Sequence, residues 1–103
     1  MKWHRLIVRS RAERDLAAAI AEYESIAPGL GAAFLSRTDA AIAAIQRAPE
    51  AYRKSHGEYR HLTLRRFPFG VFYVFDGETV AVVAVLPLRQ DPESIRATLK
   101  SNA

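Results

Sequence analysis

The order of the hydrophobic patterns along this chain predicts an α+β domain. A short strand-like stretch is followed by two segments with helical periodicity, and three apolar runs then succeed one another between Glu58 and Pro92. Elements segregated in this way form folds in which helices pack on one side of an antiparallel sheet. We therefore expect an N-terminal strand, an antiparallel two-helix hairpin, a three-stranded antiparallel meander and a short C-terminal helix. The helical hairpin should cover one face of the sheet and leave the other partly open.

The composition is that of one globular domain over residues 1–103. Hydrophobic residues make up 50% of the chain and charged residues 25%, which argues against disorder. The chain has no cysteine, which excludes disulfides and thiolate chemistry and is typical of a reducing compartment. No signal peptide is recognisable, and no apolar run reaches the length of a membrane span. We therefore expect a cytoplasmic protein without membrane contact.

The first half of the chain predicts a strand and two helices. Residues Trp3 to Val8 form the strand-like stretch. The sequence Ser10-Arg11-Ala12-Glu13 has the pattern of a capping box, in which the serine hydroxyl accepts a hydrogen bond from the glutamate amide at a helix start. Pro28-Gly29-Leu30-Gly31 should end this helix, because glycine adopts left-handed backbone readily and proline cannot continue the hydrogen-bond ladder. A second helix is expected from about Ala32 to Ala48, antiparallel to the first.

The second half predicts the sheet. We expect a loop over Ala51–Gly57, and the first strand of the meander after it. The run Phe69–Phe75 has large apolar side chains on both faces, and Thr79–Leu86 is almost wholly apolar, as is typical of a central strand buried on both sides. Asp76-Gly77 is a tight-turn signal between them. Residues Pro92 to Lys100 are expected to form the last helix.

Positive charge is concentrated in one part of the chain. The net charge is +4, and the segment from Arg53 to Arg66 alone holds five cations and one acid. Such a basic surface attracts polyanions or acidic protein segments. Arginines that only keep the protein soluble, or that protect sheet edges from aggregation, would give the same pattern. A guanidinium group can bind a phosphate or a carboxylate through two hydrogen bonds. The candidate target-binding residues are Arg60, Arg65, Arg66 and Arg89.

Catalytic and ligand-binding signals are sparse. His4, His56 and His61 lack the spacing of metal ligands, and no glycine-rich phosphate loop follows a strand, so we expect no metal and no cofactor. His61 is a candidate general base for RNA cleavage because a histidine pKa lies near neutrality. A strand histidine beside arginines is more often a surface residue.

Aromatic residues near the arginines leave nucleic-acid binding open without favouring it. Tyr59, His61 and Phe67 flank arginines and could stack on bases. Trp3 could anchor a partner protein, although packing in the core is the more common role of such a residue.

An arginine-bearing strand leads into the segment that begins at Arg66, and a very apolar strand that ends near Leu86 is followed by Arg89. This order of segments resembles the RelE/ParE toxins of bacterial type II toxin–antitoxin modules, and within them the ParE branch. The resemblance covers nearly the whole chain, including the region of Phe34 and the helix stop at Pro49. The matching segments are Ala12-Glu13-Arg14-Asp15-Leu16, Arg66-Phe67-Pro68-Phe69-Gly70-Val71-Phe72-Tyr73 and Arg89-Gln90-Asp91-Pro92.

The resemblance implies a toxin that is neutralised by a cognate antitoxin and that, as in ParE-like members, inhibits DNA gyrase by binding. RelE-like members instead cut mRNA on the ribosome, and here that activity would use Arg60, His61 and Arg89. They place an arginine where this chain has Gly70 and often use a tyrosine near the C-terminus, whereas no tyrosine follows Tyr73. These two departures favour the ParE interpretation.

Two further expectations come with the resemblance. Many ParE-like chains carry a histidine or a second basic residue near Arg89, where this chain has Leu88 and Gln90. An inactive relative that only binds its antitoxin therefore remains a third possibility. An antitoxin would contact the apolar margins of the helical hairpin and the sheet and could add a strand to an exposed edge. The candidate antitoxin-binding residues are Trp3, Tyr23, Leu30 and Phe34.

Overall fold

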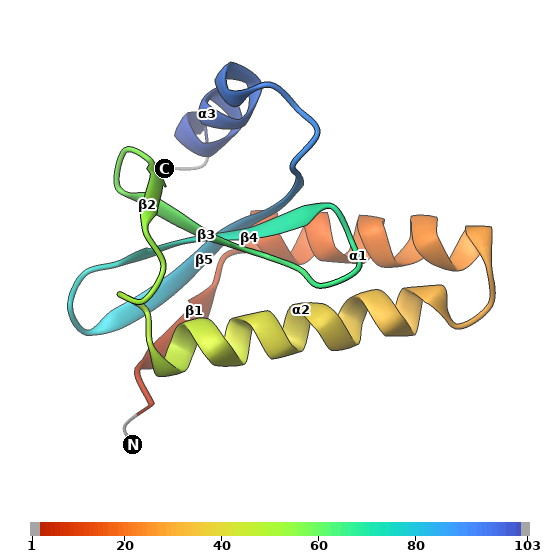
Figure 1. Cartoon of the computed structure of the whole chain (residues 1–103), viewed down its shortest axis with the longest axis horizontal. Coiled ribbons are helices and arrows are strands. Elements are labelled where there is room, and N and C mark those ends of the chain that lie inside the picture. The colour runs from red at the N-terminus through yellow and green to blue at the C-terminus, as the bar shows by residue number, and fades with distance from the viewer. Residues whose placement is uncertain (1–2, 102–103) are drawn as a thin grey trace.

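The computed structural model describes residues 3–101 and confirms the α+β class (Figure 1). The elements are β1 (Arg5–Val8), α1 (Ser10–Ile26), α2 (Leu30–Arg47), β2 (Lys54–His56), β3 (Tyr59–Thr63), β4 (Phe69–Phe75), β5 (Thr79–Pro87) and α3 (Pro92–Ser101). Their order is the expected one, with one additional strand. No helix among these residues is long and apolar enough to cross a membrane.

Within the described residues, five strands form one mixed sheet in the order β1-β5-β4-β3-β2. The meander β3-β4-β5 is antiparallel, whereas β1 lies parallel to β5. The predicted loop over residues 51–57 was wrong, because it contains β2, in which Lys54 pairs with Arg60. A three-residue strand is too short to show the alternation by which strands are recognised in a sequence.

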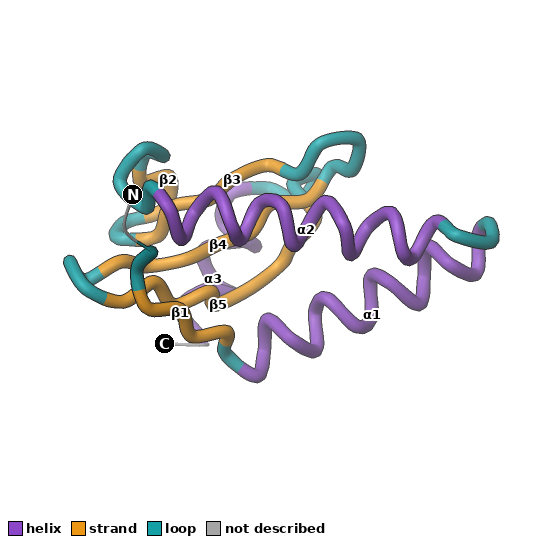
Figure 2. Tube along the Cα trace, turned by 90° about the horizontal axis from the view of Figure 1, so that it is seen from below, coloured by secondary structure: helices purple, strands orange, loops and turns teal. Residues whose placement is uncertain are grey.

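The sheet is covered on both faces, but unequally. The helical hairpin α1–α2 packs on one face, and α3 lies across part of the other (Figures 1 and 2). Ile95 and Leu99 of α3 pack in one buried cluster with Phe72 and Leu86. Residues 80–86 of β5 are each no more than 8% exposed, which confirms a central strand buried on both sides.

A β-bulge divides the side chains of β5 between the two faces. Phe72 pairs with Ala84 and Tyr73 with Val82, so Val83 is the extra residue. As a result, Val83 and Ala84 both pack toward α3, while Val82 and Val85 pack toward the helical hairpin.

An aromatic cluster connects the helical hairpin to the loop between β3 and β4. Phe34 of α2 stacks on Tyr23 of α1 with ring centroids 5.2 Å apart, and both rings meet Phe67 and Phe69 edge-on. Aromatic pairs in such arrangements contribute about 0.5–1.5 kcal/mol each beyond the area they bury. The cluster therefore fixes the base of a loop whose tip carries Arg65 and Arg66.

The start of α1 differs from the predicted capping box. Arg9 occupies the cap position, no side chain caps the helix, and the Glu13 amide donates to the Arg9 carbonyl at 3.1 Å. The Arg9 amide itself donates to the Val82 carbonyl at 2.9 Å. This bond keeps Arg9 extended as a continuation of β1, so Ser10 is already helical and cannot act as the cap.

The start of α2 also lies earlier than predicted, at Leu30. The carboxylate of Glu24, on α1, accepts hydrogen bonds from the amides of Gly29 at 3.0 Å and Gly31 at 2.9 Å. It thereby satisfies amides that a helix start leaves without partners. These backbone bonds lower the pKa of Glu24.

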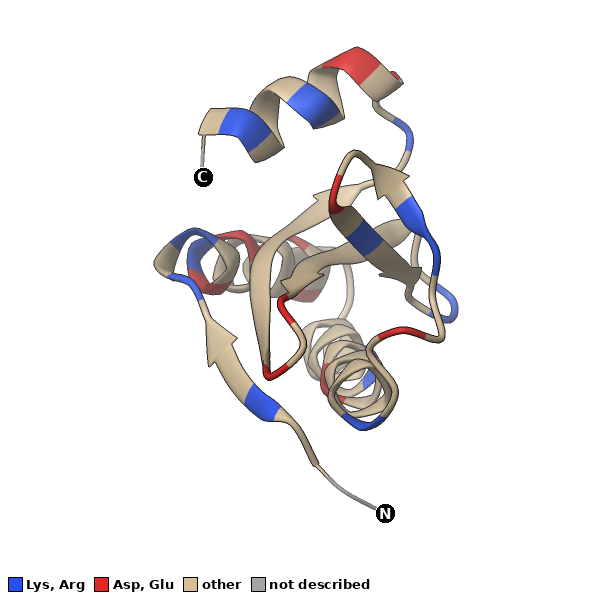
Figure 3. Cartoon of the chain, turned by 90° about the vertical axis from the view of Figure 1, so that its left-hand side faces the viewer, with Lys and Arg blue, Asp and Glu red and all other residues tan. Residues whose placement is uncertain are grey.

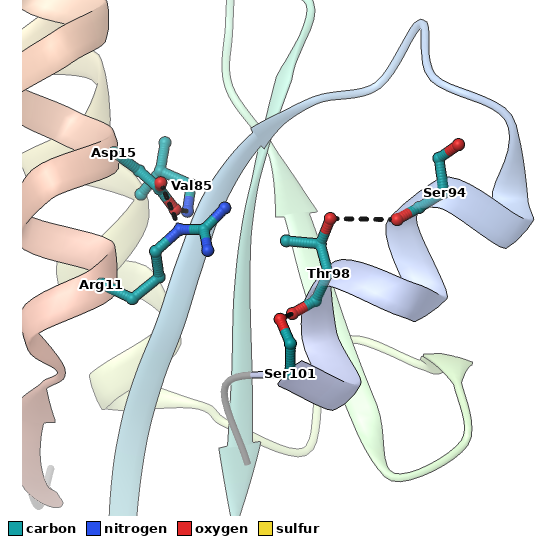
Figure 4. Close-up of polar contacts among 6 residues, drawn as sticks. All are labelled: Arg11, Asp15, Val85, Ser94, Thr98 and Ser101. Atoms are coloured by element: carbon teal, nitrogen blue, oxygen red, sulfur yellow. Dashed lines mark hydrogen bonds and ion pairs between the residues drawn. The ribbon is translucent and has the colours of Figure 1, made fainter.

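Asp15 connects α1 to the edge of β5 (Figure 4). One carboxylate oxygen accepts from Arg11 Nε at 2.7 Å, and the other accepts from the Val85 amide at 3.0 Å. The pairing of β1 with β5 ends at Val82, so the Val85 amide lies beyond the reach of β1. Asp15 thus closes the stretch of strand edge that β1 leaves open.

Trp3 does not join the core. Its side chain is 55% exposed and stacks under the guanidinium group of Arg47, 5.3 Å from the ring centroid. The core positions next to it are filled by Leu6 and Val8 of β1, so the expected core role was wrong.

Candidate target-binding surface

Three of the four candidate arginines lie at one end of the sheet, on the loops that leave β3 and β5. Phe69 pairs with Pro87, and the Leu88 amide donates to the Pro68 carbonyl at 2.9 Å, so the two loops are side by side. We call this surface, made of Arg65, Arg66 and Arg89, the basic end. All three side chains are exposed, and no ion pair found within residues 3–101 involves them.

The sheet itself contributes almost no charge to this surface. Figure 3 colours basic residues on loops, on the three helices and on β1, β2 and β3, whereas β4 and β5 carry no charged residue. Three exposed guanidinium groups on adjacent loops form a local positive field that favours carboxylate or phosphate partners.

Arg66 has a backbone conformation that is unusual for its residue type. Its φ is 75°, in the left-handed region, where a residue with a Cβ is less stable by about 1–2 kcal/mol. Backbone strain of this kind concentrates at functional sites. It supports a functional role for the side chain that the turn presents.

Arg60 lies apart from the basic end. It pairs with Tyr73 on the face of the sheet that the helical hairpin covers, and its Nη1 donates to the Tyr52 carbonyl at 2.6 Å. Tyr73 donates to the Pro49 carbonyl at 2.7 Å, and burial raises the pKa of Tyr73 to about 12, against the opposing effect of the Arg60 charge. Together these two side chains hold the segment between α2 and β2 against the sheet.

His61 faces the opposite side of the sheet from Arg60. Its ring stacks on Phe72 with centroids 4.8 Å apart, and its Nδ1 lies 2.7 Å from the Ser55 hydroxyl oxygen. Burial, helped by the nearby His56 and Arg53, lowers the pKa of His61 below its usual value. The residues that RNA cleavage would require therefore do not converge: Arg60 and His61 lie on opposite faces, and Arg89 lies beyond the far end of β3.

A groove runs between α2 and the outer edge of β3 and ends at the basic end. It has a volume of about 220 Å³, an apolar floor that includes Ala41 and Leu62, and arginines at positions 37 and 65. The Leu64 amide donates a hydrogen bond to the Phe69 carbonyl, toward β4. Because the backbone groups of consecutive strand residues point to opposite sides, the amide and carbonyl of Thr63 point away from β4, toward the outer edge. The pairing of β2 with β3 does not extend past Arg60, which leaves this edge open to a further strand.

The candidate antitoxin-binding residues are dispersed. Phe34 is completely buried, and Tyr23 and Leu30 are partly buried on the helical hairpin. Trp3 lies near the start of β1, away from these three. The large apolar side chains that the helices expose within residues 3–101 are Ile26 and Leu35.

A second group of basic residues became visible only in the structure. His56, Arg96 and Lys100 surround a hollow of about 180 Å³ between the β2–β3 turn and α3. No sequence pattern indicates this group, because α3 and the turn are far apart along the chain. Within residues 3–101, no three His, Asp or Glu side chains are grouped closely enough to hold a metal ion.

Comparison with known proteins identifies the family. Residues 6–92, from β1 to the first residue of α3, match the family described as the ParE toxin of the type II toxin–antitoxin system parDE. The chain is also 30% identical over 96 residues to Toxin ParE2 of two Mycobacterium tuberculosis strains, CDC 1551 / Oshkosh and H37Rv, covering 92% of this chain and 91% of each relative. The chain belongs to the ParE toxin family.

A solved structure shares the fold. The chromosomal ParDE toxin–antitoxin system from P. aeruginosa contains a chain that superposes with a TM-score of 0.72, covering 84% of this chain and 98% of the other at 18% identity. The matched family region of this ParE-family toxin includes the whole basic end, the groove beside β3 and the Asp15 bond to β5.

Proposed function

We propose that this ParE-family toxin arrests bacterial growth by binding DNA gyrase through the basic end, without chemistry of its own. The observation that carries the proposal is the grouping of Arg65, Arg66 and Arg89, exposed and without ion pairs in the described part of the chain, on two adjacent loops. A binding inhibitor needs an interface of charge and shape and no acid–base pair. The strained backbone at Arg66 supports the same assignment.

The position of Gly70 supports binding over RNA cleavage. A Cβ atom added there would lie 3.1 Å from both His61 Cδ2 and Leu88 Cδ2. An arginine at this position, as in the RNA-cleaving branch, would displace both side chains. The surroundings of Gly70 are therefore packed for a glycine, and the face that would carry such an active site is filled by His61, Phe72 and Leu88.

Neutralisation by an antitoxin is the second part of the proposal. The groove between α2 and β3 offers an apolar floor, an open strand edge at Thr63 and two arginines. An extended antitoxin segment would add a strand to this edge, place apolar side chains in the groove and pair its acidic residues with Arg37 and Arg65. Because Arg65 belongs to both surfaces, an antitoxin bound here would also mask part of the basic end.

The test is charge reversal at the basic end. Induction of the unmodified chain in bacteria should stop growth, and Arg65→Glu with Arg66→Glu should abolish this arrest, because two attractive contacts become repulsive. The matched control is Arg14→Glu with Arg47→Glu, two exposed arginines outside the basic end. Both double variants have the same net charge, so only the location of the change differs. Continued arrest by a folded, soluble Arg65/Arg66 variant would rule out the assignment.

A further inference from the structure

One corner of the sheet remains uncovered on the face where α3 lies. In β1, Leu6 and Val8 point toward the helical hairpin, so Arg5 and Ile7 point to the other face. The buried contacts of α3 reach Phe72, Val83, Ala84 and Leu86, but none reaches β1. Ile7 is consequently 53% exposed in the middle of a strand, although isoleucine is among the residues most often buried.

A hollow of about 280 Å³ lies directly beside Ile7. Its apolar wall includes Val74 and Ala81, and Arg9 and Asp76 lie at its rim. The corner therefore presents a branched apolar side chain next to a recess lined partly by apolar side chains. A projecting group and a recess on one surface are the elements of a self-complementary contact.

The charges of this corner are balanced, unlike those of the basic end. Arg9 and Asp76 line the hollow beside Ile7, and Arg5 and Glu78 line a neighbouring hollow. In each pair the arginine belongs to the β1 region and the acid to the turn between β4 and β5. Figure 3 shows this acidic turn next to the basic strand β1. No ion pair joins these four side chains to other groups in residues 3–101.

We propose that this corner surface, made of Arg5, Ile7, Arg9, Asp76, Glu78 and Ala81, is the interface of a homodimer. In a two-fold dimer the same patch contacts itself, so each feature must meet its complement on the same surface. Ile7 of one copy enters the hollow of the other, and the β1 arginines of one copy face the acidic turn of its partner. A surface of a single charge could not do this, because like charges would meet across the axis.

The balance of charge also argues for a second copy over the other partners. The basic end and the groove beside β3 suit acidic partners, and both lie away from the corner surface. A copy of the chain leaves both of these surfaces free. The dimer would therefore present two basic ends, and binding of target or antitoxin does not compete with it.

The experiment is sedimentation equilibrium on protein made by cell-free synthesis, which avoids growth arrest. The unmodified chain should approach twice the 11.5 kDa of one chain as its concentration rises. Ile7→Asp should shift the protein to the monomer, because a carboxylate would be buried in an apolar recess. Ile26→Asp is the matched control: it makes the same substitution at a 66%-exposed isoleucine on the helical hairpin and should leave the dimer intact. A monomeric unmodified chain, or an Ile7→Asp variant that still dimerises, would overturn the proposal.

Single-cysteine variants test the same surface without a buried charge. The chain has no cysteine of its own, so Ile7→Cys and Ile26→Cys each carry one thiol. The thiol at position 7 should react more slowly with a maleimide as protein concentration rises, while the thiol at position 26 should react at a constant rate. Equal behaviour of the two thiols would contradict the interface. Neither measurement involves growth arrest, so the dimer and the gyrase proposal succeed or fail separately.

Discussion

At the scale of single residues, Arg66 is the position where the backbone conformation disfavours the side chain that we propose for target binding. Its left-handed backbone, with φ of 75°, favours glycine over arginine by about 1–2 kcal/mol. Glycine in turn loses more conformational freedom on folding, which costs about 0.5–1 kcal/mol. We therefore expect Arg66→Gly to raise the free energy of unfolding by about 0.5–1 kcal/mol and to weaken growth arrest. Urea unfolding measures the first effect.

The neighbouring residue provides the control. Arg65 is not among the residues with positive φ, so Arg65→Gly should lower stability while removing the same charge. If both variants lose stability equally, the conformation of Arg66 is not strained.

Of the four candidate arginines, the structure brings Arg65, Arg66 and Arg89 together and places Arg60 apart from them. The grouping of Arg65, Arg66 and Arg89 follows from their places in the two loops that border the meander. Arg60 and His61 are consecutive in a strand, and consecutive strand residues point to opposite faces. That alternation alone is enough to separate their side chains. Arg37 could not be found in this way, because its place beside β3 depends on how α2 packs on the sheet.

At the scale of elements, the close approach of the two long helices depends on Gly31. A Cβ atom at this position would lie 2.8 Å from the Ile20 carbonyl oxygen and 3.0 Å from a Glu24 carboxylate oxygen. The first of these is backbone and cannot move without shifting α1. We expect Gly31→Ala to lower the free energy of unfolding by about 1–3 kcal/mol, the usual range for overpacking.

The sign of this effect makes the measurement decisive. In a helix without the close contact, alanine would be more stable than glycine by up to about 1 kcal/mol. Thermal or urea unfolding of the variant therefore distinguishes the two cases, and a stabilised Gly31→Ala variant would show that the helices can separate at no cost.

The elements that the sequence misjudged share one cause. The capping box at Ser10, the start of α2 and the loop that contains β2 were all assigned from local pattern. In each case a contact from elsewhere decides the outcome: the Val82 carbonyl holds Arg9 extended, the Glu24 carboxylate caps α2, and β3 recruits Lys54–His56 as a strand. Long, strongly patterned elements such as β5 were predicted well because their own side chains decide their burial.

At the scale of the whole molecule, the sequence specified the layers but not the connection of β1. The helical hairpin links β1 to the meander, and this long crossover allows β1 to lie parallel to β5 at the edge of the sheet. Nothing in the four residues of β1 indicates which edge they join. The position of the basic end does not depend on which edge β1 joins, because both of its loops belong to the meander.

The last prediction concerns the target that the whole molecule reaches in the cell. Pulse labelling of DNA and protein synthesis after induction of the chain should show that DNA synthesis falls first, because we propose gyrase as the target and because the residues that RNA cleavage would require do not converge. The Arg65/Arg66 charge-reversal variant is the control and should leave both rates unchanged. An earlier fall in protein synthesis would indicate RNA cleavage instead. His61 would then be the first residue to replace, because its pKa is lowered and its ring contacts the Ser55 hydroxyl. If neither rate falls, the chain is an inactive family member, and the groove between α2 and β3 becomes its main functional surface.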